Sequence, residues 1–143
     1  MRYIVTTIGA AASAAALLLS TGAANAAPAA PASLYAPSAL VLGVGKGESA
    51  ATTTVERAVT LSCAPTPSGT HPAPKAACKE LLAVEGEFGL LSKAPTGPCT
   101  RQWDPVTVTA SGVWQGKYVN WSTTYGNACE MRASLAGGAV FSF

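Results

Sequence analysis

The stretch VTVTASGVWQGKYVNWSTTY, residues 106–125, consists of two alternating runs joined by a glycine-containing connection. In the first run, valines and an alanine share one parity while threonines take the other. In the second run, Val119 and Trp121 alternate with more polar neighbours. Because successive side chains of a strand point to opposite faces, this period of two predicts two strands. The connection, residues 112–116, predicts that they pair as an antiparallel hairpin.

Three further segments extend this hairpin into a sheet. ALVLGVG, residues 39–45, is a short apolar run closed by glycine and predicts a buried strand. In TVERAVTLSC, residues 54–63, apolar and polar side chains alternate, which predicts a half-buried strand with Arg57 as the exception on its apolar side. AVFSF, residues 139–143, predicts a last strand, so the sequence predicts five strands in all.

The clearest helical spacing lies between the predicted strand of residues 54–63 and the hairpin of residues 106–125. In residues 74–91, Ala77, Leu81 and Val84 recur at the period of a helix, which predicts an amphipathic helix over 74–84. A second short turn is expected before Leu91, whereas GNACEM is interpreted as a turn. The predicted fold class is therefore α+β: a five-stranded antiparallel sheet with one or two short helices packed on it.

The first residues have the pattern of a secretory signal peptide. Arg2 is the only charge before Lys46, and an apolar run ends near Leu19. That run is shorter than the roughly 20 residues that span a bilayer, which disfavours the alternative of a membrane anchor. A small-x-small site ends at Ala26, so we expect residues 1–26 to be removed and the protein to be secreted.

The rest of the chain has the length of one domain. Residues 27–33, APAAPAS, are expected to form a flexible N-terminal arm, and residues 34–143 one folded domain. The formal net charge of the whole chain is only +2, and no basic run or basic-aromatic pattern occurs. We therefore predict neither a nucleic-acid partner nor a membrane partner.

The four cysteines all follow the predicted signal peptide, where an oxidising environment favours two disulfides. Three pairings are open, and the sequential one, Cys63 with Cys78 and Cys99 with Cys129, is favoured because it closes two moderate loops. A metal site is the weaker alternative. No C-x-x-C motif occurs, and the single histidine, His71, lies in a proline-rich loop, so no metal or other cofactor is predicted.

The residues needed for catalysis are scarce. A hydrolase needs a nucleophile, a base and a group that orients the base, and this chain offers one histidine and one aspartate. Asp104 and Glu130 form a weak alternative, a carboxylate pair for glycoside hydrolysis. A second alternative is an extracellular carbohydrate-binding module that uses exposed Trp103 and Trp114, whereas Trp121 is assigned to the core. No enzymatic activity is predicted.

The segment KAPTGPCTRQWDP, residues 93–105, is expected to be irregular because of its prolines and glycine. It is tethered at Cys99 and continues into a strand after Pro105. Arg101 is the one cation near its centre, and it suits either a solvated surface or the acidic pocket of a partner.

Motifs along the whole predicted domain resemble the subtilisin inhibitor-like family of secreted bacterial serine-protease inhibitors. They are SLYAPSALVLGVGKG, ERAVTLSCAP, PSGTHPAP, WDP, GVWQGK, ACEM and the C-terminal VFSF. The resemblance implies a five-stranded antiparallel sheet with two helices, the sequential disulfide pairing and a homodimer formed through a sheet face. It also implies that subtilisin-like proteases are partners.

The resemblance assigns the reactive peptide bond to the position two residues after the third cysteine, which is Arg101-Gln102 here. The implied protease-binding residues are Cys99, Thr100, Arg101, Gln102, Trp103 and Asp104. Asn127 matches an asparagine that supports the loop from beneath. The family's type member has methionine and proline where this chain has Arg101 and Thr100, so trypsin-like targets are expected in addition and a backbone restraint is lost.

Overall fold

The computed structural model describes residues 36–95 and 97–143; the predicted signal peptide and N-terminal arm lie outside them. Four strands, two α-helices and one 3-10 helix follow one another along the chain. Their bounds are β1 Ala39–Lys46, β2 Thr54–Ser62, α1 Pro74–Ala83, η1 Phe88–Leu91, β3 Val106–Trp114, β4 Lys117–Tyr125 and α2 Ala128–Ser134.

The strands form one antiparallel sheet in the order β2-β1-β3-β4. The predicted hairpin is confirmed as β3 and β4, whose register pairs Trp114 with Lys117. Gln115 and Gly116 form the two-residue turn between them, with φ of 47° and 79°. Two consecutive positive φ values are typical of the tight turns whose twist matches that of paired strands.

The sheet that the structure describes has four strands, so the prediction of a fifth is wrong. Residues 139–143 form a turn instead, and Val140 and Phe141 are buried beneath the sheet. The Glu80 carboxylate accepts hydrogen bonds from the backbone N–H groups of Ala139 and Val140, the latter at 2.9 Å. These donors are therefore satisfied by a side chain of α1 rather than by a neighbouring strand.

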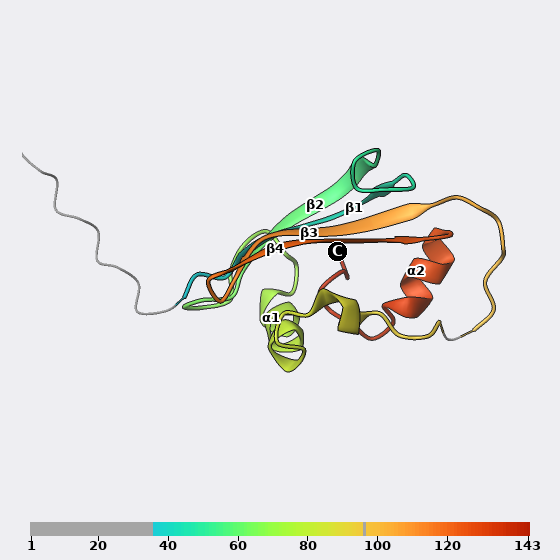
Figure 1. The fold of residues 1–143 in the computed structure, drawn as a ribbon. Coiled ribbons are helices and arrows are strands. Elements are labelled where there is room, and N and C mark those ends of the chain that lie inside the picture. Colours follow the sequence, from blue (N-terminus) through green and yellow to red (C-terminus); the bar gives the residue numbers. More distant parts are fainter. Residues whose placement is uncertain (1–35, 96) are drawn as a thin grey trace, which may run out of the picture. The chain divides into compact units, whose positions relative to one another are not determined.

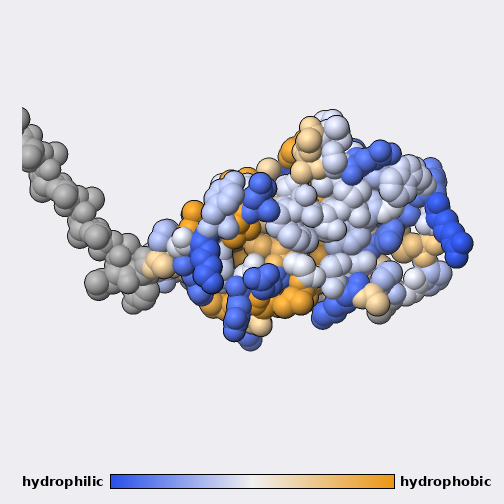
Figure 2. Space-filling model, viewed as in Figure 1, coloured by the Kyte–Doolittle hydropathy of each residue, from blue (hydrophilic) through white to orange (hydrophobic). Residues whose placement is uncertain are grey.

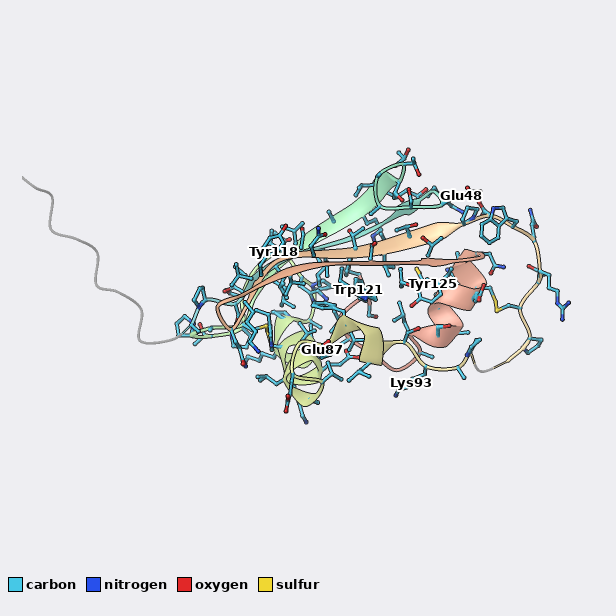
Figure 3. The ribbon with its side chains drawn as sticks, in the orientation of Figure 1. Glu48, Glu87, Lys93, Tyr118, Trp121 and Tyr125 are labelled. Carbon is cyan, nitrogen blue, oxygen red and sulfur yellow. A yellow bond between two sulfur atoms is a disulfide. The ribbon has the colours of Figure 1, made fainter. Side chains whose placement is uncertain are left out.

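The helices cover one face of the sheet, and the C-terminus lies on that same side (Figure 1). Leu42 and Val108 from the sheet pack in one core with Leu81 of α1 and with Phe141. Trp121 lies between the sheet and the helical layer, stacked on Phe88 with ring centroids 5.5 Å apart (Figure 3). The prediction that Trp121 belongs to the core is confirmed.

β2 is less buried than its alternation predicts. It is an edge strand, and only Leu61 near its C-terminal end is fully buried, whereas Val55 and Arg57 are exposed. The Cys63–Cys78 disulfide joins that end to α1, so the helical layer covers β2 only there. The second disulfide joins Cys99 to Cys129, which completes the predicted sequential pairing.

The segment interpreted as a turn, GNACEM, instead starts α2. Asn127 is the N-cap: its side-chain oxygen accepts a hydrogen bond from the N–H of Glu130 at 3.0 Å. The Glu130 carboxylate reaches back to the N–H of Gly126 at 2.9 Å. This reciprocal arrangement resembles a capping box and satisfies donors that a helix start leaves free.

The described residues include no helix that is long and apolar enough to cross a membrane.

Candidate functional site

The connection between η1 and β3 carries the predicted site. Its described residues, 92–95 and 97–105, have no regular secondary structure, and the chain follows a wide arc at one end of the sheet (Figure 1). Hydrophilic residues gather on the surface at this end (Figure 2). The five residues from Thr100 to Asp104 are all exposed, so a partner can reach them without any rearrangement of the core.

The first anchor of this loop lies on its N-terminal side. Cys99, two residues before Arg101, is joined by the disulfide to Cys129 in the first turn of α2. Since α2 is capped by Asn127 and packs against the core through Met131, the tether leads to a fixed element. The disulfide limits the positions that the loop can reach.

The second anchor lies beneath Arg101. The Asn127 side-chain amide donates one hydrogen bond to the carbonyl oxygen of Thr100 at 2.8 Å and another to that of Gln102 at 3.1 Å. Its oxygen is held by the N–H of Glu130, which fixes the orientation of the amide. One side chain therefore holds the carbonyls on both sides of Arg101.

Arg101 itself is exposed, and its side chain makes no hydrogen bond or ion pair with the residues that the structure describes. A guanidinium without a partner keeps all five N–H donors available. The backbone around Arg101 is thus held while its side chain is offered to solvent.

The side chains of Trp103 and Asp104, which follow Arg101, are held by a different part of the chain. The indole Nε1 of Trp103 donates to Glu48 Oε1 at 2.9 Å, and the Asp104 carboxylate forms an ion pair with Lys46. The N–H of Asp104 also donates to the carbonyl of Gly126 at 2.9 Å. Sequence reasoning missed Lys46 and Glu48, because residues more than 50 positions away give no local signal.

The tryptophan pair expected for a carbohydrate-binding module does not exist. Trp103 is 65% exposed, but Trp114 is only 3% exposed and belongs to the core. Trp114 packs against Gly86, where an added Cβ would come within 2.2 Å of the indole ring. The prediction that Trp114 is exposed is therefore wrong.

The other alternative sites are also accounted for by structural contacts. Asp104 is paired with Lys46, and Glu130 accepts from Gly126, so neither carboxylate of the suggested glycosidase pair is free. His71 is buried: its Nε2 lies 3.2 Å from the carbonyl oxygen of Val140, and its Nδ1 accepts from the N–H of Ala73. No group of three or more potential metal ligands occurs within residues 36–95 and 97–143.

Comparison with known proteins gives a consistent result. The family described as subtilisin inhibitor-like matches residues 36–127. A subtilisin inhibitor of Streptomyces violaceus is 52% identical over 146 residues and covers 100% of both chains. Subtilisin inhibitor-like protein 4 of Streptomyces lavendulae is 59% identical over 115 residues, which are 80% of this chain and 97% of the relative.

A solved structure is also similar to this chain. It is the crystal structure of Streptomyces caespitosus sermetstatin in complex with Bacillus licheniformis subtilisin. The two chains are 49% identical and superpose with a TM-score of 0.71 over 75% of this chain and 99% of the other.

Proposed function

Since this chain belongs to the subtilisin inhibitor-like family, whose members are protease inhibitors and not enzymes, we propose that it inhibits serine proteases as a substrate-like ligand. The reactive bond is Arg101-Gln102. One observation carries this proposal: the carbonyls of Thr100 and Gln102 are held by Asn127, while the Arg101 side chain between them is exposed and has no partner among residues 36–95 and 97–143.

Preorganisation explains why such a loop inhibits rather than merely being digested. A flexible substrate loses conformational freedom when it binds, and a loop already tied by a disulfide and by hydrogen bonds loses less. More of the contact free energy then appears as affinity. Protease-inhibitor interfaces bury about 1,600 Å² in total, and some of them are among the tightest complexes known.

The proteases that fit are of two kinds. A subtilisin-like partner is supported by the relative that has been crystallised with subtilisin. A trypsin-like partner is supported by the chemistry of Arg101, because a planar, permanently charged guanidinium can bind a carboxylate at the base of a pocket with two parallel hydrogen bonds.

Hydrolysis of the reactive bond would leave both new ends attached to the protein. The Cys99–Cys129 disulfide holds the segment that ends at Arg101, and β3 holds the segment that begins at Gln102. Religation can therefore compete with release. Thr100 weakens this restraint relative to a proline at the same position, because its backbone φ is not locked by a ring.

The experiment that tests the proposed function is an active-site titration of trypsin and of subtilisin with the mature protein. Residual activity is expected to fall linearly and to reach zero near one inhibitor per protease. Digestion of the loop without stoichiometric inhibition of either enzyme would refute the proposal.

The place of action follows from the N-terminal sequence. We propose that residues 1–26 direct secretion and that inhibition takes place outside the cell, where both disulfides are stable.

Asn127→Ala is expected to convert the inhibitor into a poorer one that is cut faster, because both carbonyl contacts around Arg101 are lost. The variant also loses the N-cap of α2, at a cost of about 1 kcal/mol in unfolding free energy. Asn127→Asp separates the two effects, since its carboxylate can still cap the helix but cannot donate to the loop. Urea unfolding and the rate of loop cleavage by catalytic trypsin are the two measurements. Equal cleavage rates for Asn127→Asp and the unsubstituted protein would contradict the assigned role.

We also propose a homodimer formed through the face of the sheet opposite the helices. That face presents Val41, which is 48% exposed, and Tyr118, which is 78% exposed, beside small residues such as Ser111. Sedimentation equilibrium is expected to give twice the monomer mass. Val41→Lys should shift the protein to monomer and leave trypsin inhibition unchanged. A monomer throughout the micromolar range for the unsubstituted protein would exclude this dimer.

A further inference from the structure

The segment Lys46-Gly47-Glu48, which links β1 to the following turn, lies against the part of the loop that follows Arg101. Three contacts connect them: Trp103 Nε1 donates to Glu48, Lys46 pairs with Asp104, and the N–H of Gly47 donates to the carbonyl of Pro105 at 3.1 Å. Figure 3 shows Glu48 at the end of the sheet, near the start of β3, the strand that follows the loop.

This segment is itself held by the sheet. The Thr107 hydroxyl donates to the carbonyl of Gly47 at 2.8 Å, and the Thr124 hydroxyl donates to the carbonyl of Glu48 at 3.2 Å. The two hydroxyls lie 2.7 Å apart, and Thr107 is 1% exposed. Glu48 and Lys46 therefore project from a platform fixed by β3 and β4, not from a free turn.

The contacts of this platform hold side chains that follow the reactive bond, whereas those already described are a disulfide before the bond and hydrogen bonds to the backbone. The disulfide holds Cys99, before the reactive bond, and Asn127 holds the carbonyls of Thr100 and Gln102. Lys46 and Glu48 instead hold the side chains of the second and third residues after the bond.

We propose that Lys46 and Glu48 are positioning residues that keep the new amino terminus, Gln102, in place after hydrolysis, and so set how long the inhibitor survives its protease. This inference rests on the proposed reactive bond Arg101-Gln102. When that bond is cut, the new α-amine belongs to Gln102, and the amine must stay beside the Arg101 carbonyl carbon to reform the peptide bond. Religation joins the amine to that carbon and releases one water molecule, so it requires no further reactant.

Solvent exposure explains why these contacts are stronger in the complex than in the free protein. Exposed hydrogen bonds and ion pairs are weak because water competes for their groups. Trp103 is 65% exposed and directly follows Gln102, so a bound protease covers it and excludes water from its contact with Glu48. The same contact is then stronger, since the local dielectric constant falls. Holding the amine near its reaction partner raises its effective concentration.

The test uses the full mature protein and trypsin. Glu48→Ala and Trp103→Phe each remove the indole contact, and Lys46→Met removes the ion pair. We expect the ratio of cut to intact inhibitor within the trypsin complex, approached from both directions, to rise about tenfold in Glu48→Ala and in Trp103→Phe, as for loss of a hydrogen bond from which water is excluded. The association rate constant of Glu48→Ala should stay within about twofold, because docking of Arg101 is unchanged.

Two controls separate positioning from mere folding stability. Glu48→Gln keeps an oxygen that can accept from the indole and is expected to restore the ratio, while Glu56→Ala removes an exposed glutamate of β2 and should leave it unchanged. Glu48→Ala combined with Trp103→Phe should be no worse than either alone, since both remove one contact. The unfolding temperatures of Glu48→Ala and Glu56→Ala should be alike.

The outcomes distinguish this inference from the function on which it rests. Inhibition by the unsubstituted protein, together with an unchanged ratio in Glu48→Ala, overturns the positioning role alone. Equal ratios in Glu48→Ala and Glu48→Gln, both shifted, also overturn it, because the acceptor oxygen would then be irrelevant. Absence of inhibition and of any cut at Arg101-Gln102 in the unsubstituted protein overturns both proposals.

Discussion

Arg101→Glu is expected to abolish inhibition of trypsin while the fold is retained. In the proposed complex, the substituted side chain would be buried against the carboxylate of the protease pocket. Breaking a buried ion pair so that one charge is left unpaired costs about 3–5 kcal/mol, which corresponds to a loss of roughly 10²- to 10⁴-fold in affinity. Because Arg101 is exposed and its side chain has no partner among the described residues, thermal unfolding of the variant should be unchanged.

A matched variant distinguishes charge from loop geometry. Arg101→Met removes the charge but keeps a long, flexible apolar side chain, so trypsin inhibition should fall sharply while subtilisin inhibition persists. Inhibition constants for both proteases provide the measurement. If Arg101→Glu inhibits trypsin as well as the unsubstituted protein does, another residue must enter the pocket.

Replacing both Cys99 and Cys129 with serine is expected to turn the inhibitor into a substrate. The disulfide is the main covalent tether of the segment that ends at Arg101, and without it the cut ends can separate before religation. The bridge spans 30 residues, for which the chain-entropy model gives about 3.5 kcal/mol of stability. We expect rapid, complete cleavage after Arg101 by catalytic trypsin and a lower midpoint of urea unfolding.

The second disulfide provides the control for that experiment. Replacing both Cys63 and Cys78 with serine removes a bridge that spans 15 residues, worth about 3 kcal/mol in the same model, but leaves the loop tethered. This variant should lose comparable stability and still inhibit at conditions where it is folded. If the two double variants were cleaved at equal rates, general destabilisation would explain the effect of losing Cys99–Cys129.

The parts of the fold that the sequence predicts correctly depend on local periodicity. The hairpin of β3 and β4 follows from strict alternation, and α1 follows from helical spacing after a proline. The pairing of the cysteines follows from loop lengths. Each of these signals lies within a few tens of residues, where the chain's own pattern dominates.

The missing fifth strand shows where local patterns stop being sufficient. AVFSF is apolar enough for a strand, but the N–H groups of Ala139 and Val140 donate to Glu80, which lies on α1 about 60 positions earlier. Only the three-dimensional arrangement brings that carboxylate to the C-terminus. A short apolar run cannot by itself reveal whether it joins a sheet or fills the space beneath one.

For two other incorrect predictions, the exposure of Trp114 and the turn at GNACEM, the sequence contains a pattern that favours the observed structure. Trp114 has the same parity as Val106 and Val108, which face the core, so alternation already favoured its burial. Asn127 and Glu130 have the spacing of a capping box, which indicates the start of a helix. In both cases a nearby glycine, which favours a turn, competes with the pattern of the surrounding residues.

The candidate site was predictable in part. The tether at Cys99 and the exposure of Arg101 follow from loop composition and cysteine spacing, and the family resemblance singled out Asn127. The contacts of Lys46 and Glu48 with the loop depend on the register of β1 against β3, which places Lys46 opposite Val106 beside the end of the loop. Nothing in the local sequence of either segment predicts that proximity.

The most direct test of the central claim is to identify the first bond that trypsin cuts in the mature protein. We predict that a catalytic amount of trypsin converts a fraction of the protein into a species whose mass is greater by one water molecule. Reduction of the disulfides should then release two fragments, one ending at Arg101 and one beginning at Gln102. The cut fraction should reach a plateau, because religation balances hydrolysis. First cleavage at any other bond, or progressive digestion with no plateau, would contradict the account.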